Sequence, residues 1–220
     1  RGPHRMSVHP GEGAGPRERT VRMPRAQRRR QLLGCARGVF VERGYAGTAM
    51  DQIAEAAAVS KPVLYQHFLG KHELFLELLD TEVADLTGRL TAAMSSPGDN
   101  RHRVHATVEA VFAYMGSPGR SHRLLFDSGA EHDPQVRARV EAVERAVASQ
   151  VSRILAEDTR VGDAEAEILS RGLVAYVLGA ARHWADRLEA GRRPDAARTA
   201  AIVDALLWTG LSHLPTGRAA

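Results

Sequence analysis

Apolar residues recur at helical spacing along most of the chain, and stretches rich in Gly, Pro and Ser separate them. Helices are predicted at about residues 24–43, 50–57, 61–68, 72–93, 101–116, 120–128, 134–157, 164–188 and 195–211. No segment shows the alternating pattern of a strand, and the sequence has no internal repeat or heptad run. The predicted fold class is therefore all-α.

Between residues 48 and 71 the pattern predicts two short helices joined by a tight turn. Thr48, followed three residues later by Asp51, resembles a capping box that starts the first helix. Ala58 and Val59 form the turn, and Ser60 is expected to cap the second helix. The arrangement is typical of a helix-turn-helix, although most such hairpins in all-α proteins are packing units.

The second short helix has an apolar side and a side rich in hydrogen-bond donors. Leu64 and Phe68 lie at i, i+4 and are predicted to face inward. The residues predicted to face outward are Lys61, Val63, Gln66 and His67. A donor-rich outer face of this kind favours contact with DNA.

Charge is distributed unevenly along the chain. The formal net charge is +4, of which residues 1–23 carry +3 and residues 24–71 carry +5, which leaves −4 for the rest. A basic N-terminal third on an acidic body predicts a polyanionic partner at one end only. Residues 1–23 have almost no apolar content and are predicted to be a disordered basic arm.

The segment from about residue 25 to 75 resembles the N-terminal domain of the TetR family. The resemblance is carried by Thr48, Met50, Ile53, Ala54, the run from Val59 to Phe68, and Lys71. It implies a three-helix DNA-binding domain at residues 24–71, followed at residues 72–220 by a larger helical domain that binds a small ligand and dimerises. The family usually has Gly at the position of Ala58, where left-handed geometry is often needed and alanine costs roughly 1 kcal/mol.

Eight residues are predicted to contact a double-stranded DNA operator: Thr48, Lys61, Pro62, Val63, Tyr65, Gln66, His67 and Lys71. Thr48 and the first backbone N–H groups of its helix are expected to hold a phosphate, and Tyr65, His67 and Lys71 to fix the duplex backbone. Lys61 and Gln66 are expected to reach base edges, and Val63 and Pro62 to contact a thymine methyl. The alternatives are that Tyr65 packs under the helix and that His67 is a plain surface residue.

A single unit of this kind reads only a few base pairs, so a homodimer on a pseudo-palindromic operator is expected. The last two predicted helices carry apolar faces that no later helix covers, and they are predicted to form a four-helix interface. Their apolar residues are Ile168, Leu169, Leu173, Tyr176, Val177, Trp184, Ile202, Val203, Leu206, Leu207 and Leu211, with the small residues Gly172, Ala175, Gly179 and Ala180 between them. The alternative is that both faces are ordinary core.

Apolar side chains of the middle and late helices predict a pocket for a hydrophobic or amphipathic effector. The predicted lining is Phe112, Met115, Leu125, Phe126, Val147, Tyr176 and Trp184. The stretches 99–126 and 180–184 also resemble a TetR subgroup of actinobacterial fatty-acid regulators that sense long-chain acyl-CoA. Release from DNA is the commoner family response and makes a repressor, whereas a subgroup activates; both stay open. The alternative function is a ligand-independent helical DNA-binding protein.

The sequence holds no G-x-S-x-G, HExxH, Gly-rich phosphate loop or Cys/His metal spacing, so no enzyme, cofactor or metal site is predicted. His102, His105 and Glu109 could form half a metal site, but a solvated helix face is favoured. No apolar run approaches the ~20 residues that span a bilayer, so no membrane partner is expected. The single Cys35 excludes an intramolecular disulfide framework and fits a cytoplasmic protein.

Overall fold

The computed structural model describes residues 23–211 and 213, so residues 1–22 of the predicted arm at residues 1–23 lie outside this part of the chain. Nine helices are present in it, and they confirm the predicted all-α fold and the existence of each predicted helix. They are α1 (Arg25–Arg43), α2 (Met50–Ala56), α3 (Lys61–Tyr65), α4 (Lys71–Met94), α5 (Asn100–Met115), α6 (His122–Phe126), α7 (Pro134–Asp158), α8 (Asp163–Glu189) and α9 (Ala196–Leu211). None of the described helices is both long and apolar enough to cross a membrane.

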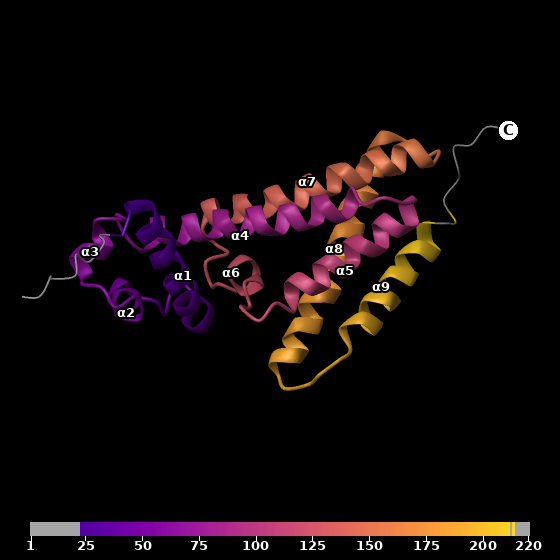
Figure 1. The fold of residues 1–220 in the computed structure, drawn as a ribbon. Helices are drawn as coiled ribbons and strands as arrows, with labels where there is room; N and C mark the ends of the chain where they lie inside the picture. Colours follow the sequence, from indigo (N-terminus) through magenta and orange to yellow (C-terminus); the bar gives the residue numbers. More distant parts are fainter. Residues whose placement is uncertain (1–22, 212, 214–220) are drawn as a thin grey trace, which may run out of the picture.

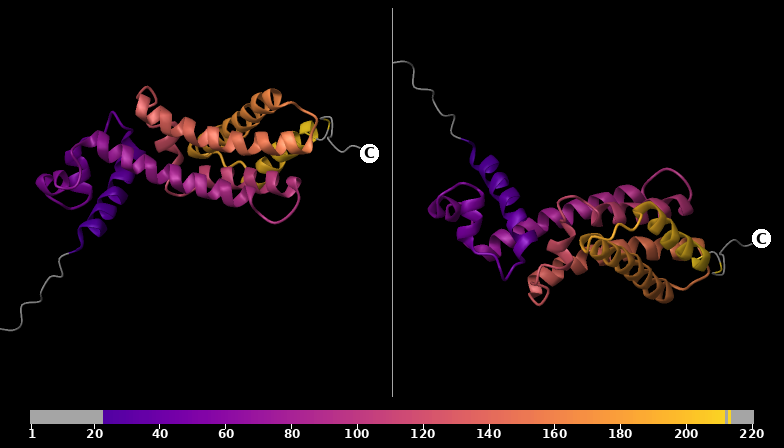
Figure 2. Two further views of the ribbon diagram at one scale, coloured as in Figure 1. Left: turned by 90° about the horizontal axis from the view of Figure 1, so that it is seen from above. Right: turned by 90° about the horizontal axis from the view of Figure 1, so that it is seen from below.

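Helices α1, α2 and α3 gather at one end of the molecule, and we call residues 24–70 the head (Figure 1). Helix α4 leaves the head and runs into the remaining helices, which we call the body. In the body α4 packs against α5 and α7, α7 packs against α8, and α5 packs against α9. The two further views show the same elongated arrangement, with the head at one end (Figure 2).

The head is built around a small core that forms because the apolar positions of its three helices converge on it. Leu32 and Phe40 of α1, Ile53 of α2 and Leu64 of α3 are each exposed by 2% or less. Each such side chain contributes about 1.5–3 kcal/mol by leaving water. Phe75 of α4 closes the core, with its ring centroid 4.9 Å from that of Phe40. The first turns of α4 are therefore part of the head's packing.

The start of α2 differs from the prediction. The N-cap residue is Ala49, and the Gln52 side-chain oxygen accepts the Ala49 N–H at 2.9 Å. The predicted capping box of Thr48 and Asp51 is therefore wrong. The Thr48 hydroxyl donates instead to the Gly44 carbonyl at 2.7 Å, back across the turn that follows α1.

Helix α3 is shorter than predicted, because it ends at Tyr65 and residues 66 and 67 form a turn after it. Ser60 stands at the N-cap with extended backbone, as expected, but its hydroxyl makes no capping hydrogen bond. Leu64 and Phe68 are buried, which confirms the predicted inward face.

Ala58 lies in the turn between α2 and α3 with a φ of 52°, in the left-handed region. Non-glycine residues there place Cβ close to the carbonyl oxygen, at a cost of roughly 1–2 kcal/mol. Ala57, directly before it, has right-handed backbone with φ −87° and ψ −2° and a buried side chain. Ala57 and Ala58 are therefore adjacent alanines with right-handed and left-handed backbone, and Ala57 can serve as the control for a substitution at Ala58.

We expect Ala58→Gly to raise the free energy of unfolding by about 0.5–1 kcal/mol, because it removes the strain while adding chain entropy to the unfolded state. Ala57→Gly, the control, should lower it by a similar amount. Urea denaturation followed by circular dichroism measures both. Equal destabilisation by the two variants would contradict the strained turn.

Candidate nucleic-acid interface and ligand cavity

Helix α3 is anchored by its buried side and presents the opposite side to solvent. Leu64 and Phe68 hold it on the head core. Lys61, Pro62, Tyr65 and Gln66 are exposed, and Val63 and His67 are half-buried. Tyr65 is 42% exposed, which argues against the alternative that it packs under the helix. The arrangement leaves donors and a phenol on one outward surface.

Four arginines in the first two turns of α1 divide into two roles. Arg29 hydrogen-bonds the Glu77 carboxylate of α4 and the His67 carbonyl, and its guanidinium lies 4.2 Å from the Phe68 ring centroid. The hydrogen bond to Glu77 raises the pKa of Arg29, so this cation is held in place.

Three other arginines of α1 are less engaged. Arg25 donates to the Gln66 carbonyl at 3.4 Å, and Arg28 donates to the neighbouring Gln31 at 3.0 Å. Arg30 is exposed. None of the three meets a carboxylate within 4 Å among the described residues, so the start of α1 carries a cationic surface that suits phosphate groups. Arg25 and Arg28 place part of this surface beside α3.

Lys61 forms an exposed ion pair with Asp51 of α2, with a Nζ–Oδ1 distance of 2.8 Å. The hydrogen bond to Asp51 raises the pKa of Lys61. Exposed pairs of this kind contribute little stability, so contact between Lys61 and a base edge requires only that the side chain leave Asp51.

Two further predicted DNA contacts, Thr48 and Lys71, have side-chain partners within the protein, whereas the buried Nδ1 of His67 has no hydrogen-bond partner among the described residues. Thr48 is 3% exposed, so its hydroxyl is turned away from solvent and a phosphate at this helix start would meet backbone N–H groups instead. Lys71 donates to the Tyr45 carbonyl at 2.9 Å and lies over the Tyr45 ring. Burial lowers the pKa of His67, and nearby Arg25 lowers it further, so the ring is neutral near pH 7.

An apolar cavity of about 120 Å³ lies inside the body, between α4, α5, α7 and α8, with contributions from α6 and α9. Its wall is formed by Leu86, Leu90, Met94, Val104, Val108, Val111, Leu125, Phe126, Val140, Val143, Val147, Val151, Ile154, Leu155, Leu173, Val174, Val177, Leu178 and Leu207. From Val140 to Leu155 the α7 wall is about 22 Å long at 1.5 Å per residue. A ligand that fills a cavity this apolar would have to be hydrophobic where it meets the wall.

Polar groups touch the cavity at two places. Asn100, Arg103 and Thr107 lie on α5, and Glu144 lies on α7. The Arg103 guanidinium donates to the Asn100 side chain at 3.1 Å and to the Ser96 carbonyl at 3.3 Å. An amphipathic molecule with an anionic group would meet a cation at the α5 side.

Of the seven residues predicted to line the pocket, the structure places Leu125, Phe126 and Val147 on its wall. Phe112 and Trp184 pack against each other with ring centroids 5.6 Å apart, away from the wall. Met115 is 1% exposed in the core, and Tyr176 is 38% exposed on the outer side of α8. The contribution of α4 to the cavity wall was not predicted from the sequence. The signal was present, because Leu86, Leu90 and Met94 are apolar residues spaced four apart, on one side of the helix.

In the structure, some residues of the predicted dimer faces are buried in the body and others are exposed. Val177, Trp184, Val203 and Leu207 are buried in the body, so for them the core alternative is correct. The large apolar residues left exposed are Ile168, Leu169 and Tyr176 on α8 and Ile202 and Leu206 on α9. A Cβ added at Gly172 or Gly179 would meet nothing within 4 Å, so the α8 surface between them is open. The side chain of Leu211 lies outside the described part of the structure.

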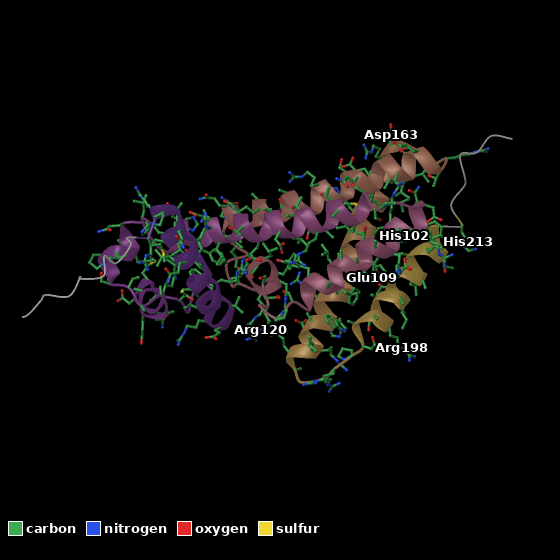
Figure 3. The ribbon with its side chains drawn as sticks, viewed as in Figure 1. His102, Glu109, Arg120, Asp163, Arg198 and His213 are labelled. Carbon is green, nitrogen blue, oxygen red and sulfur yellow. The ribbon has the colours of Figure 1, made fainter. Side chains whose placement is uncertain are left out.

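His102 and Glu109 of α5 lie in the body, far from the head (Figure 3). His105 contacts Asp204 of α9 at 3.1 Å and Glu109 at 3.3 Å, and so ties α5 to α9. No group of three or more His, Cys, Asp and Glu side chains in the described part of the chain has the arrangement of a metal site.

Comparison with known proteins gives a consistent result. The family "Bacterial regulatory proteins, tetR family" matches residues 32–78. The transcriptional activator FasR of Mycolicibacterium smegmatis is 38% identical over 205 residues, which cover 93% of this chain and 92% of FasR. A TetR-like regulator from Rhodococcus sp. RHA1 superimposes with a TM-score of 0.68 at 27% identity, over 87% of this chain and 100% of that one. FadR of Bacillus subtilis, solved with stearoyl-CoA, has a TM-score of 0.66 at 15% identity, over 82% and 98% of the two chains.

We expect Val147→Phe to weaken binding of a fluorescent alkyl-chain probe by at least about tenfold. The added ring would displace part of the chain, and each buried methylene contributes about 0.8 kcal/mol against about 1.4 kcal/mol per tenfold in affinity. Phe112→Leu is the control, because Phe112 packs on Trp184 outside the wall. Titrations of probe fluorescence measure both. A larger loss in Phe112→Leu than in Val147→Phe would mean that the probe binds elsewhere.

Proposed function

Because the chain belongs to the TetR family, and is therefore a DNA-binding transcriptional regulator and not an enzyme, we propose that it binds a pseudo-palindromic operator as a homodimer under the control of a long-chain fatty acyl-CoA. The observation that carries the proposal is the combination of an outward-facing α3 and a cationic start of α1 with an apolar cavity lined in part by α4. Three arginines at the start of α1 meet no carboxylate in the described chain.

The eight predicted DNA contacts keep distinct roles in the proposal. Gln66 and Lys61 read base edges, with Pro62 and Val63 beside them for a thymine methyl. Tyr65, His67 and Lys71 hold the duplex backbone, and Thr48 shapes the turn that presents the backbone N–H groups of α2. The cationic surface at the start of α1 adds charge that draws the head to phosphate.

The proposed dimer uses the exposed apolar residues of α8 and α9. Ile168 is 72% exposed and Leu206 is 63% exposed, and each would leave water when two copies meet. The small residues on α8 allow the helices of two copies to approach closely. Two heads held about 34–36 Å apart would read half-sites one helical turn apart.

The proposed effector is a long-chain acyl-CoA because the cavity is apolar, its α7 wall extends over about 22 Å, and Arg103 lies beside it. Stearoyl-CoA bound to the FadR neighbour supports this chemistry for the fold. Residues 99–126, which resemble the acyl-CoA-sensing subgroup, contribute Asn100, Arg103 and Phe126 to the cavity. FasR is an activator, so the proposal leaves open whether the effector releases or strengthens operator binding.

We expect single substitutions in the head to separate base reading from backbone contact. Gln66→Ala should reduce discrimination at one position of each half-site by roughly tenfold, since a bidentate pair is worth about 1–3 kcal/mol. Tyr65→Phe should weaken binding on every sequence by a few-fold. Lys71→Ala should reduce the slope of log affinity against log salt by about one. Fluorescence anisotropy on the inverted repeat of the gene's own promoter measures all three.

The control for these variants is Gln150→Ala, which removes the same kind of side chain from a half-buried position on α7 in the body. It should leave affinity, sequence preference and salt slope unchanged. Operator binding that is indifferent to all three head variants would overturn the assignment of α3 as the reading helix.

A further inference from the structure

Three successive residues at the end of α6 contact three different parts of the protein. The Phe126 side chain lies on the cavity wall. The Asp127 carboxylate meets Arg182 of α8, and the Ser128 carbonyl accepts a hydrogen bond from the head. Because adjacent residues of one backbone cannot move independently by much, a displacement of Phe126 reaches the other two contacts directly.

Arg182 fixes this segment from the side of α8. Its Nη2 donates to the Phe126 carbonyl and to Asp127 Oδ1, each at 3.2 Å. Its guanidinium also lies 5.2 Å from the Phe126 ring centroid. One side chain therefore holds the backbone, the carboxylate and the cavity-facing ring of the same short run.

The segment reaches the head through Tyr45. The Tyr45 N–H donates to the Ser128 carbonyl at 2.7 Å. In the described part of the chain, this is the one backbone–backbone hydrogen bond that joins residues 24–70 to the body beyond α4. Gly44 lets the chain approach, since it has a φ of 68° and a Cβ there would lie 3.2 Å from the Ser128 oxygen.

Tyr45 is in turn the partner of Lys71. The Lys71 ammonium donates to the Tyr45 carbonyl at 2.9 Å and lies 4.5 Å from the ring centroid. The Tyr45 ring also packs 4.9 Å from Phe75 in the head core. Because the Tyr45 carbonyl accepts from Lys71 and its N–H donates to Ser128, this residue links the proposed phosphate contact to the cavity wall.

We propose that Arg182 is a positioning residue that holds residues 126–128 against Tyr45, so that cavity filling and the α8 surface set the placement of the head. The role of the effector in this inference rests on the proposed function. The mechanical link between Arg182 and Tyr45 does not depend on the proposed function. It makes the loop after α6 a second connection between body and head, parallel to α4. Asp127 is the partner through which Arg182 acts.

The mechanical link is tested in the full-length protein without effector. We expect Arg182→Gln to speed hydrogen exchange in the peptide that contains Tyr45 by at least about tenfold, because the Ser128 carbonyl is no longer held. Asp127→Asn, which keeps the size of the side chain, should give a smaller increase, and the double variant should add little to Arg182→Gln. Arg171→Gln is the control, since Arg171 forms an exposed pair with Glu167 on the same helix. Exchange at Tyr45 that equals the control in both variants would overturn the proposal.

The second measurement uses palmitoyl-CoA as the probe and compares operator affinity with and without it. Asp127→Asn and Arg182→Gln should bind palmitoyl-CoA within about twofold of the wild type, since neither side chain lies on the cavity wall. The factor by which palmitoyl-CoA changes operator affinity should fall at least about threefold. If palmitoyl-CoA changed operator affinity by the same factor in both variants as in the wild type, the coupling role would be overturned. No effect of palmitoyl-CoA on the wild type would instead count against the proposed effector, while the exchange result still decides the link.

Discussion

The structure depends on α4 being shared by two cores. Its first turns pack into the head through Leu74 and Phe75, and its last turns form cavity wall through Leu86, Leu90 and Met94. A continuous helix of 24 residues is about 36 Å long and stiff on that scale. Any change in how the cavity end is packed must therefore alter how the head end sits, unless the head core itself gives way.

Buried and exposed charges have different tasks in this arrangement. Arg29 and Arg37 join α1 to α4 through Glu77 and Glu82, and Glu82 is only 2% exposed. A buried carboxylate that loses its cation is costly, so the pair of Arg37 with the buried Glu82 favours one orientation of α1 on α4. The arginines at the start of α1 that meet no carboxylate in the described chain are left for phosphate. Positive charge on α1 thus has two tasks: some arginines hold α1 on α4, and others suit the phosphates of the proposed DNA partner.

The sequence predicts the fold well because helical periodicity and turn residues are local signals. The nine helices of the described chain follow from them, and so do the inward Leu64 and Phe68. Sites formed by several helices are predicted less well. Val147 lies on the cavity wall while Phe112 does not, because that depends on which helix faces which. The cap at Ala49 escapes prediction because Gln52 supplies it from inside the helix, whereas the spacing of Thr48 and Asp51 imitates a capping box one residue earlier.

In the proposed regulator, one ligand in the body and one operator at the head share a coupling free energy. This coupling is tested most directly by measuring both affinities both ways, with palmitoyl-CoA and the promoter's inverted repeat. The factor by which palmitoyl-CoA changes the operator Kd should equal the factor by which the operator changes the palmitoyl-CoA Kd, at roughly 5- to 150-fold. If both partners bind but neither changes the Kd of the other, the coupling is contradicted.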